Sequence, residues 1–221
     1  MAGSATVSKR VIRAVAASLA SATVAETGTD TAPGAVRRLD GDEAAELAGL
    51  AAVFDDLQYV LRCCEHLVGV LAQPAPDDAL AEALWTGALV GYARPFSARE
   101  KVLTADDLAA LELDGDVLGF HKALLRLRDY YASRHVNPRE SYTIGVAQKN
   151  NGSAAGVAVV GAQQAGVDDT TVRQLGRLAY GLSGLVDGRM QAAQQRVHLA
   201  AQGMDAARLA RLPLVNVSVG T

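Results

Sequence analysis

The stretch that decides the fold is DVLGFHKALLRLRDYYASRHVN, residues 116–137. His121, Arg128 and His135 follow one another in it at intervals of seven residues. Because an α-helix has about 3.6 residues per turn, seven residues make nearly two turns, and these three side chains share one face. The same stripe holds three apolar residues, Leu118, Leu125 and Ala132. We expect a helix over 116–136 whose buried cations form either a satisfied structural network or a site.

The composition around this stretch favours a helical protein. The chain has 221 residues, of which 50% are hydrophobic but only 5% aromatic. Alanine and leucine supply much of the apolar fraction, and both favour helix. This length permits one sizeable core with at most an appendage. The predicted fold class is mainly α, an antiparallel helical bundle of four to five long helices with one β-hairpin insertion.

Periodicity and turn residues place the other elements. Apolar residues at intervals of three and four predict long helices over about 42–72, 77–94 and 168–202, with a short helix after Thr104. Residues 141–148 and 155–163 are rich in Val, Ile, Tyr and Ala and flank KNNGS, in which Asn-Gly is a strong hairpin signal. The glycines of GLSGLVDG, residues 181–188, fall within the last helix, where we expect them to permit close helix packing.

These elements divide the chain into three predicted parts. Residues 1–34 form an N-terminal helix, over about 5–26, and a linker rich in Thr, Gly, Asp and Pro. Residues 35–203 form the helical bundle, with the hairpin at about 141–163. Residues 204–221 form a C-terminal tail with a short helical piece near Ala206.

Charge, cysteine content and hydropathy limit the classes of function. A net charge of −3 disfavours a general nucleic-acid-coating surface but allows a local basic cluster that binds a phosphate. Cys63 and Cys64 are adjacent, which disfavours a disulfide between them and indicates a reduced cytoplasmic location. They also lack metal-ligand spacing, and we expect neither a metal nor a cofactor. No apolar run is long enough for a membrane span, so no membrane association is expected.

The order of elements and one motif resemble a known group of proteins. The segment ARPFSAR (residues 93–99), the motif RDYYASRHVN (128–137) and the strand pair after it are similar to those of the HEPN superfamily. That superfamily is marked by an Arg, often a polar residue after it, and a His beyond a spacer of four to six residues. Here six residues separate Arg128 from His135, and the resemblance covers about 42–200.

This resemblance implies metal-independent RNA cleavage by a homodimer, of the kind found in defence or toxin systems. It implies that His135 acts as a general acid or base and that Arg128 braces the phosphate. Asp129 would orient the side chain of either His135 or Arg128. A helix C-terminus stabilises an imidazolium while nearby arginines oppose it, so His135 is suited to titrate near neutrality. Further candidates for binding RNA or a nucleotide are Arg94, Arg99, Arg134 and Asn137.

A structural interpretation of the same residues stays open. Arg128 can form an ordinary ion pair with Asp129, Glu100 or Glu140, and His135 can cap the last helical carbonyls. The other histidines are interpreted as core or interface residues, His66, His121 and His198. The competing function is that of a non-catalytic helical interaction or assembly protein, such as a regulator or a phage or defence-complex subunit, whose strands or tail dock onto another copy or a different protein.

Overall fold

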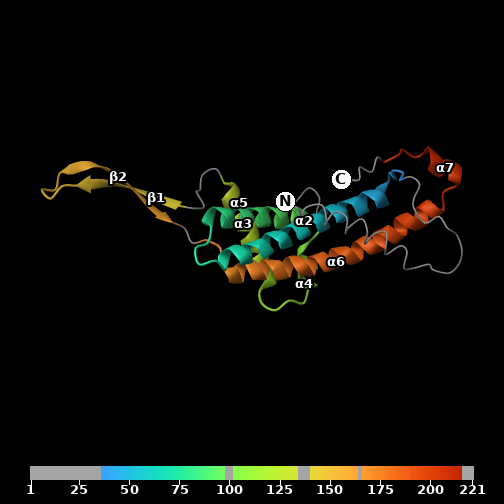
Figure 1. The fold of residues 1–221 in the computed structure, drawn as a ribbon, viewed down its shortest axis with the longest axis horizontal. Coiled ribbons are helices and arrows are strands. Elements are labelled where there is room, and N and C mark those ends of the chain that lie inside the picture. The colour runs from blue at the N-terminus through green and yellow to red at the C-terminus, as the bar shows by residue number, and fades with distance from the viewer. Residues whose placement is uncertain (1–35, 98–101, 134–139, 164–165, 216–221) are drawn as a thin grey trace. The chain divides into compact units, whose positions relative to one another are not determined.

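The structure is a computed structural model that describes residues 36–97, 102–133, 140–163 and 166–215 (Figure 1). It is mainly helical with one two-stranded antiparallel sheet, as the sequence predicts. Its elements in chain order are α2 (Asp42–Leu71), α3 (Asp78–Ala93), the 3₁₀ turn η1 (Arg94–Phe96), α4 (Ala105–Ala109), α5 (Val117–Ala132), β1 (Glu140–Gln148), β2 (Ala154–Gln163), α6 (Asp169–Gln202) and α7 (Ala206–Arg211). The helix expected over 5–26 lies outside the described residues.

The chain divides into two compact units. The larger unit spans Gly41–Ala200 and contains the helical core. The described parts of the other unit are residues 36–40 and 201–215. In this second unit Arg37 and Leu214 form an antiparallel bridge, and the Arg37 guanidinium donates to the Leu212 carbonyl at 2.7 Å. Residues 212–215 of the predicted tail are therefore paired with residues 36–38.

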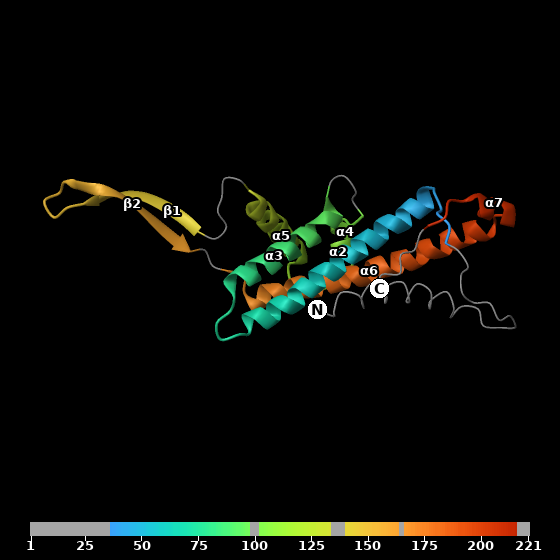
Figure 2. The same cartoon turned by 45° about the horizontal axis from the view of Figure 1, so that its top comes forward.

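In the larger unit, α2 and α6 lie side by side in both views (Figures 1 and 2). Their contacts run in opposite directions along the two helices, since Glu46 bonds Arg196 at one end and Gln58 bonds Ser183 further along. The two helices are thus antiparallel. Leucine and valine at intervals of three and four fill the space between the helices, among them the fully buried Leu57, Val60, Leu67, Val172, Leu175, Leu182 and Val186.

Glycine lets α3 pack closely against α2. A Cβ atom added at Gly91 would lie 3.1 Å from Val60 Cγ2 and 3.3 Å from Tyr59 Cδ1. Among the glycines of residues 181–188, only Gly181 has such a neighbour, Leu111 at 3.3 Å, while Gly184 and Gly188 have none within 4 Å. Leu111 follows the end of α4 (Ala105–Ala109), so Gly181 packs closely against a turn, and the expected close packing between helices is not found at these three glycines.

Capping residues begin the helices where the sequence predicts. Asp77 accepts from Leu80 N–H, and Asp116 accepts from Gly119 N–H at 2.8 Å. Thr104 and Asp107 form a capping box at the start of α4, the short helix expected after Thr104. These bonds satisfy amide groups that have no partner within their helix.

The predicted end of α5 is wrong. The helix ends at Ala132 rather than near Val136, because Ser133 already has an extended backbone with ψ of 139°. The sequence after Ala132 explains the early end, since Ser, His, Val and Asn are weak helix formers and Pro138 disfavours helix before it. Within α5 the buried residues are His121 and Leu124, whereas Leu118, expected on the buried stripe, is 39% exposed.

The predicted hairpin is present. β1 and β2 pair antiparallel, with Ile144 opposite Val159 and Val146 opposite Val157. The turn contains Gly152 at a φ of +85°, a conformation that glycine adopts without strain. Lys149 N–H donates to the Ser153 carbonyl at 2.8 Å and closes the loop.

Candidate functional site

The candidate site begins in the last turn of α5, at Arg128 and Asp129. Arg128 Nε lies 2.9 Å from Asp129 Oδ1, and the two side chains are 39% and 71% exposed. The Nε atom itself is buried and makes no hydrogen bond of acceptable geometry. Neighbouring helical residues point about 100° apart, which explains a short distance with poor alignment. The pair is therefore a local contact on the surface of one helix.

Arg94, a predicted substrate-binding residue, contacts a different helix. Its guanidinium lies 3.2 Å from Oδ1 of Asp56 on α2, whose side chain is 16% exposed. Burial raises the pKa of Asp56, although the Arg94 charge opposes that rise. Arg94 thus joins η1 to α2 and is not paired with Asp129.

Four predicted site residues lie outside the described residues, Arg99, Arg134, His135 and Asn137. Of the predicted catalytic residues, Arg128 and Asp129 are therefore the two that the structure brings together. The roles assigned to the other four stay predictions.

His121, which lies seven residues before Arg128 on the same face of α5, belongs to the core, as expected. His121 is 8% exposed, and its Nδ1 lies 2.8 Å from the Tyr92 hydroxyl on α3. The Phe96 ring packs on the imidazole with ring centroids 4.6 Å apart. Burial lowers the pKa of His121, with a smaller effect from Lys122, and burial raises the pKa of Tyr92. A neutral imidazole that accepts from the Tyr92 O–H fits both shifts.

The other two histidines do not lie in the core, and their interpretation as interface residues stays a prediction. His66 and His198 are both exposed. Trp85 is 3% exposed and belongs to the core.

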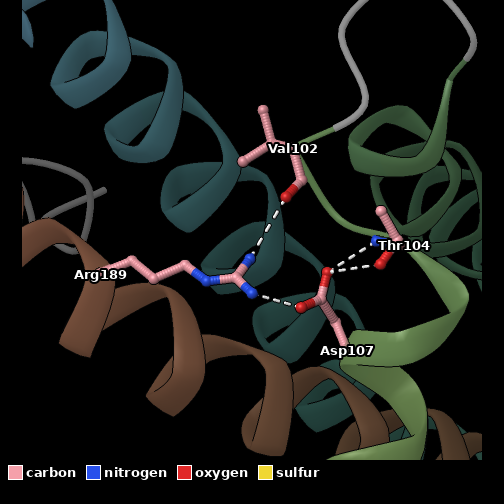
Figure 3. A network of polar contacts seen from close by, with 4 residues as sticks. All are labelled: Val102, Thr104, Asp107 and Arg189. Carbon is pink, nitrogen blue, oxygen red and sulfur yellow. Dashed lines mark hydrogen bonds and ion pairs between the residues drawn. The ribbon is translucent and has the colours of Figure 1, made fainter.

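Sequence reasoning missed a second polar network, between α4 and α6 (Figure 3). Asp107 accepts from Thr104 N–H at 2.7 Å and from Nη2 of Arg189. The other terminal nitrogen of Arg189, Nη1, donates to the Val102 carbonyl at 3.3 Å. Burial tends to raise the pKa of Asp107, but hydrogen bonds from Arg189 and Thr104 outweigh burial and hold it below its usual value. Sequence spacing gives no signal for this pair, because Arg189 stands 82 residues from Asp107 in the sequence.

A pocket of about 380 Å³ lies between the start of α5 and the first turns of α6. Its wall combines apolar side chains with Asp114, Asp116 and Arg177. Asp116 is occupied in capping α5. Arg94, Arg128 and Asp129 do not line this pocket, so it is separate from the predicted site.

The cysteines are not suited to metal binding or redox chemistry. Cys63 and Cys64 are 3% and 5% exposed, and burial raises the pKa of both thiols, that of Cys64 to about 12. A thiol with a raised pKa is a weak nucleophile at neutral pH. Across the described residues, no three His, Cys, Asp or Glu side chains are grouped closely enough to hold a metal ion. Nor is any described helix both long and apolar enough to cross a membrane.

No known protein family, curated protein or solved structure matches this chain. The HEPN resemblance therefore stays a prediction from the motif and the order of elements.

Proposed function

We propose that this protein is a HEPN-like helical bundle that binds RNA and cleaves it without a metal ion, acting as a homodimer. In this proposal Arg128 binds a backbone phosphate, Asp129 orients the guanidinium, and His135 transfers protons at the 2′-hydroxyl or the leaving oxygen. The observation that supports it is the bonding of Arg128, a half-buried guanidinium whose ion pair within the described residues is with the carboxylate next to it in sequence.

Three other arginines of the described chain have partners on different elements, whereas Arg173, like Arg128, pairs within its own helix, with Asp169. Arg94 pairs with Asp56 of α2, Arg189 with Asp107 of α4, and Arg196 with Glu46 of α2. Each of these pairs fastens two elements together. Arg128 does not join two of the described elements. A purely structural role therefore explains Arg128 less well than it explains Arg94, Arg189 and Arg196.

The local chemistry suits a phosphate. A guanidinium presents a planar fork of N–H donors that matches two phosphate oxygens. Asp129 is 71% exposed, so the ion pair it forms with Arg128 is a weak competitor for that fork. Aligned bonds to a phosphate would also give the buried Nε the acceptor that it lacks.

The test uses a labelled single-stranded RNA and the full chain in excess chelator. The variants are Arg128→Ala, Arg128→Lys and His135→Ala, with Arg126→Ala as the matched control. Arg126 is exposed on the same helix, but two residues are about 200° of rotation, so it leaves α5 on nearly the opposite side from Arg128. A DNA oligonucleotide of the same sequence tests whether cleavage needs the 2′-hydroxyl.

We expect wild-type protein to cleave RNA but not DNA in the presence of chelator. Arg128→Ala should weaken RNA binding by about tenfold or more, since a charge-assisted bond is worth about 1.5–3 kcal/mol. Arg128→Lys should restore part of it, and Arg126→Ala should change it by less than about twofold. His135→Ala should abolish cleavage while RNA still binds. Equal cleavage by all variants, or binding and cleavage by none including wild type, would refute the proposal.

One observation favours the competing function, an interaction or assembly protein without catalysis. The hairpin exposes large apolar side chains that are typical of a docking surface. On that hypothesis the wild-type protein leaves RNA intact, and Arg128→Ala does not alter association with its partner.

A further inference from the structure

One face of the hairpin is apolar and uncovered. We define the hairpin face as Ile144, Val146, Val157 and Val159, which the strand register places together. These side chains are 64–75% exposed, and within the described chain no residue of β1 or β2 belongs to the buried core. A hairpin of two strands is at best marginally stable in water unless its apolar face is packed against something. The hairpin face therefore requires a partner.

The opposite face of the same hairpin differs in character. It carries mostly small or polar side chains, Ser141, Thr143, Gly145, Ala147, Gly156, Ala158 and Ala162, together with one larger residue, Val160. The hydrophobic effect would thus favour binding of a partner to the hairpin face rather than to the opposite face of the hairpin.

The distribution of charged residues on the hairpin indicates which class of partner can bind its apolar face. Residues 141–148 and 154–163 contain no charged side chain. The strands thus offer no basic residue to an anionic lipid or nucleic acid, and no pattern of charge to a different protein. Apart from Glu140 at the base of β1, they also lack the charged residues and prolines with which exposed strands commonly avoid association.

The two charged residues of the hairpin lie at opposite ends. Glu140 stands at its base, beside Tyr142, and Lys149 stands at the turn. When two hairpins pack antiparallel about a twofold axis, Lys149 of each copy comes near Glu140 of the other. A twofold interface requires a surface that complements itself, and both the uniform apolar side chains and this charge arrangement satisfy that requirement.

We infer that the hairpin face packs antiparallel against the same face of a second copy of this chain. The inference deepens the proposed function, because it names the surface that forms the homodimer. The nine residues of β1 give a face about 30 Å long and about 10 Å wide, or about 300 Å², which is less than the roughly 800 Å² per partner of a standard interface. We therefore expect a weak, reversible contact.

The test compares two adjacent valines on opposite faces of β2. Val159 lies on the hairpin face and is 64% exposed, while Val160 points to the other face and is 58% exposed. Val159→Lys and Val160→Lys therefore make the same chemical change at equal distance from the turn. Sedimentation of the full chain, from about 1 to about 100 μM, measures the dimer dissociation constant of each.

We expect wild-type protein and Val160→Lys to dimerise with similar constants, and Val159→Lys to dimerise at least about 100-fold more weakly, because an unpaired ammonium would be buried. Equal weakening by both variants, or by neither, would overturn the inference. So would a wild-type protein that stays monomeric at every concentration, which is the result expected if another part of the chain covers the hairpin face. Circular dichroism checks that each variant keeps its helices.

A cysteine pair provides a second measurement. Val159→Cys should give a disulfide-linked dimer under a mild oxidant, whereas Val160→Cys should not. The native cysteines do not interfere, since both are buried. Cross-linking of both variants to the same extent would overturn the inference. These results stand apart from the RNA assay, since a dimer that leaves RNA intact would refute only the proposed function, and RNA cleavage with unchanged Val159→Lys dimers would refute only the hairpin inference.

Discussion

Among single residues, His121 is the group whose burial has a predictable pH dependence. Burial lowers its pKa in the folded protein below the usual value near 6.5, so the folded state favours the neutral ring. The stability that this ring contributes is full above about pH 6.5 and is lost as the pH falls through the lower folded pKa. We expect His121→Asn, which cannot titrate, to cost about 1–3 kcal/mol at pH 7 and to lessen the loss of stability between about pH 7 and pH 5.

The measurement is urea unfolding of both proteins at a series of pH values. His66→Asn is the control, because it makes the same substitution at an exposed histidine. A His121→Asn protein that loses stability on acidification as steeply as wild type would contradict the assignment.

The sequence located some of these side chains and not others, for a physical reason. Helical periodicity put His121 and Arg128 on one stripe of α5, and both are at least partly buried. Periodicity describes one helix at a time, so it did not indicate that Arg94 reaches Asp56 or that Arg189 reaches Asp107. Such pairs depend on how helices pack, which local spacing does not encode.

Among the elements, the close approach of α2 and α3 depends on Gly91. Alanine there would gain up to about 1 kcal/mol of helix propensity but would press on Val60, which is fully buried and has little room to move. We expect Gly91→Ala to destabilise the protein by about 1–2 kcal/mol net. Gly184→Ala on α6 is the matched change in open space and should stabilise by up to about 1 kcal/mol. Thermal unfolding checks both, and stabilisation by Gly91→Ala would show that α2 and α3 are less tightly packed than described.

The elements were predicted best where local chemistry determines them. Asp77, Asp116 and the Thr104 capping box begin helices at the expected residues, and Asn-Gly sits in the turn of the hairpin. The end of α5 was missed by four residues. No cap marks that end, and the choice between helix and extended chain after Ala132 rests on many weak preferences.

In the whole molecule, the helical core and the hairpin differ in what stabilises them. The buried core of the Gly41–Ala200 unit is built from helices and the segments joining them, and the described hairpin residues add nothing to it. Hydrophobic burial is the dominant favourable term in folding, so the helical core should unfold as one cooperative unit without help from the hairpin. On the inferred dimer, the hairpin would instead gain its stability from association.

Replacing residues 141–162 with a short Gly-Ser linker tests this separation. Glu140 and Gln163 are cross-strand partners, about 5 Å apart, so a few residues span the gap without pulling on the helices. At a protein concentration where wild type is monomeric, we expect the melting temperature of the shortened chain to lie within about 3 °C of wild type, a difference below about 1 kcal/mol. At higher concentration wild type should gain stability through dimerisation, and the shortened chain should not. A broad transition or lost helicity in the shortened chain would instead mean that the hairpin is part of the fold of its own subunit.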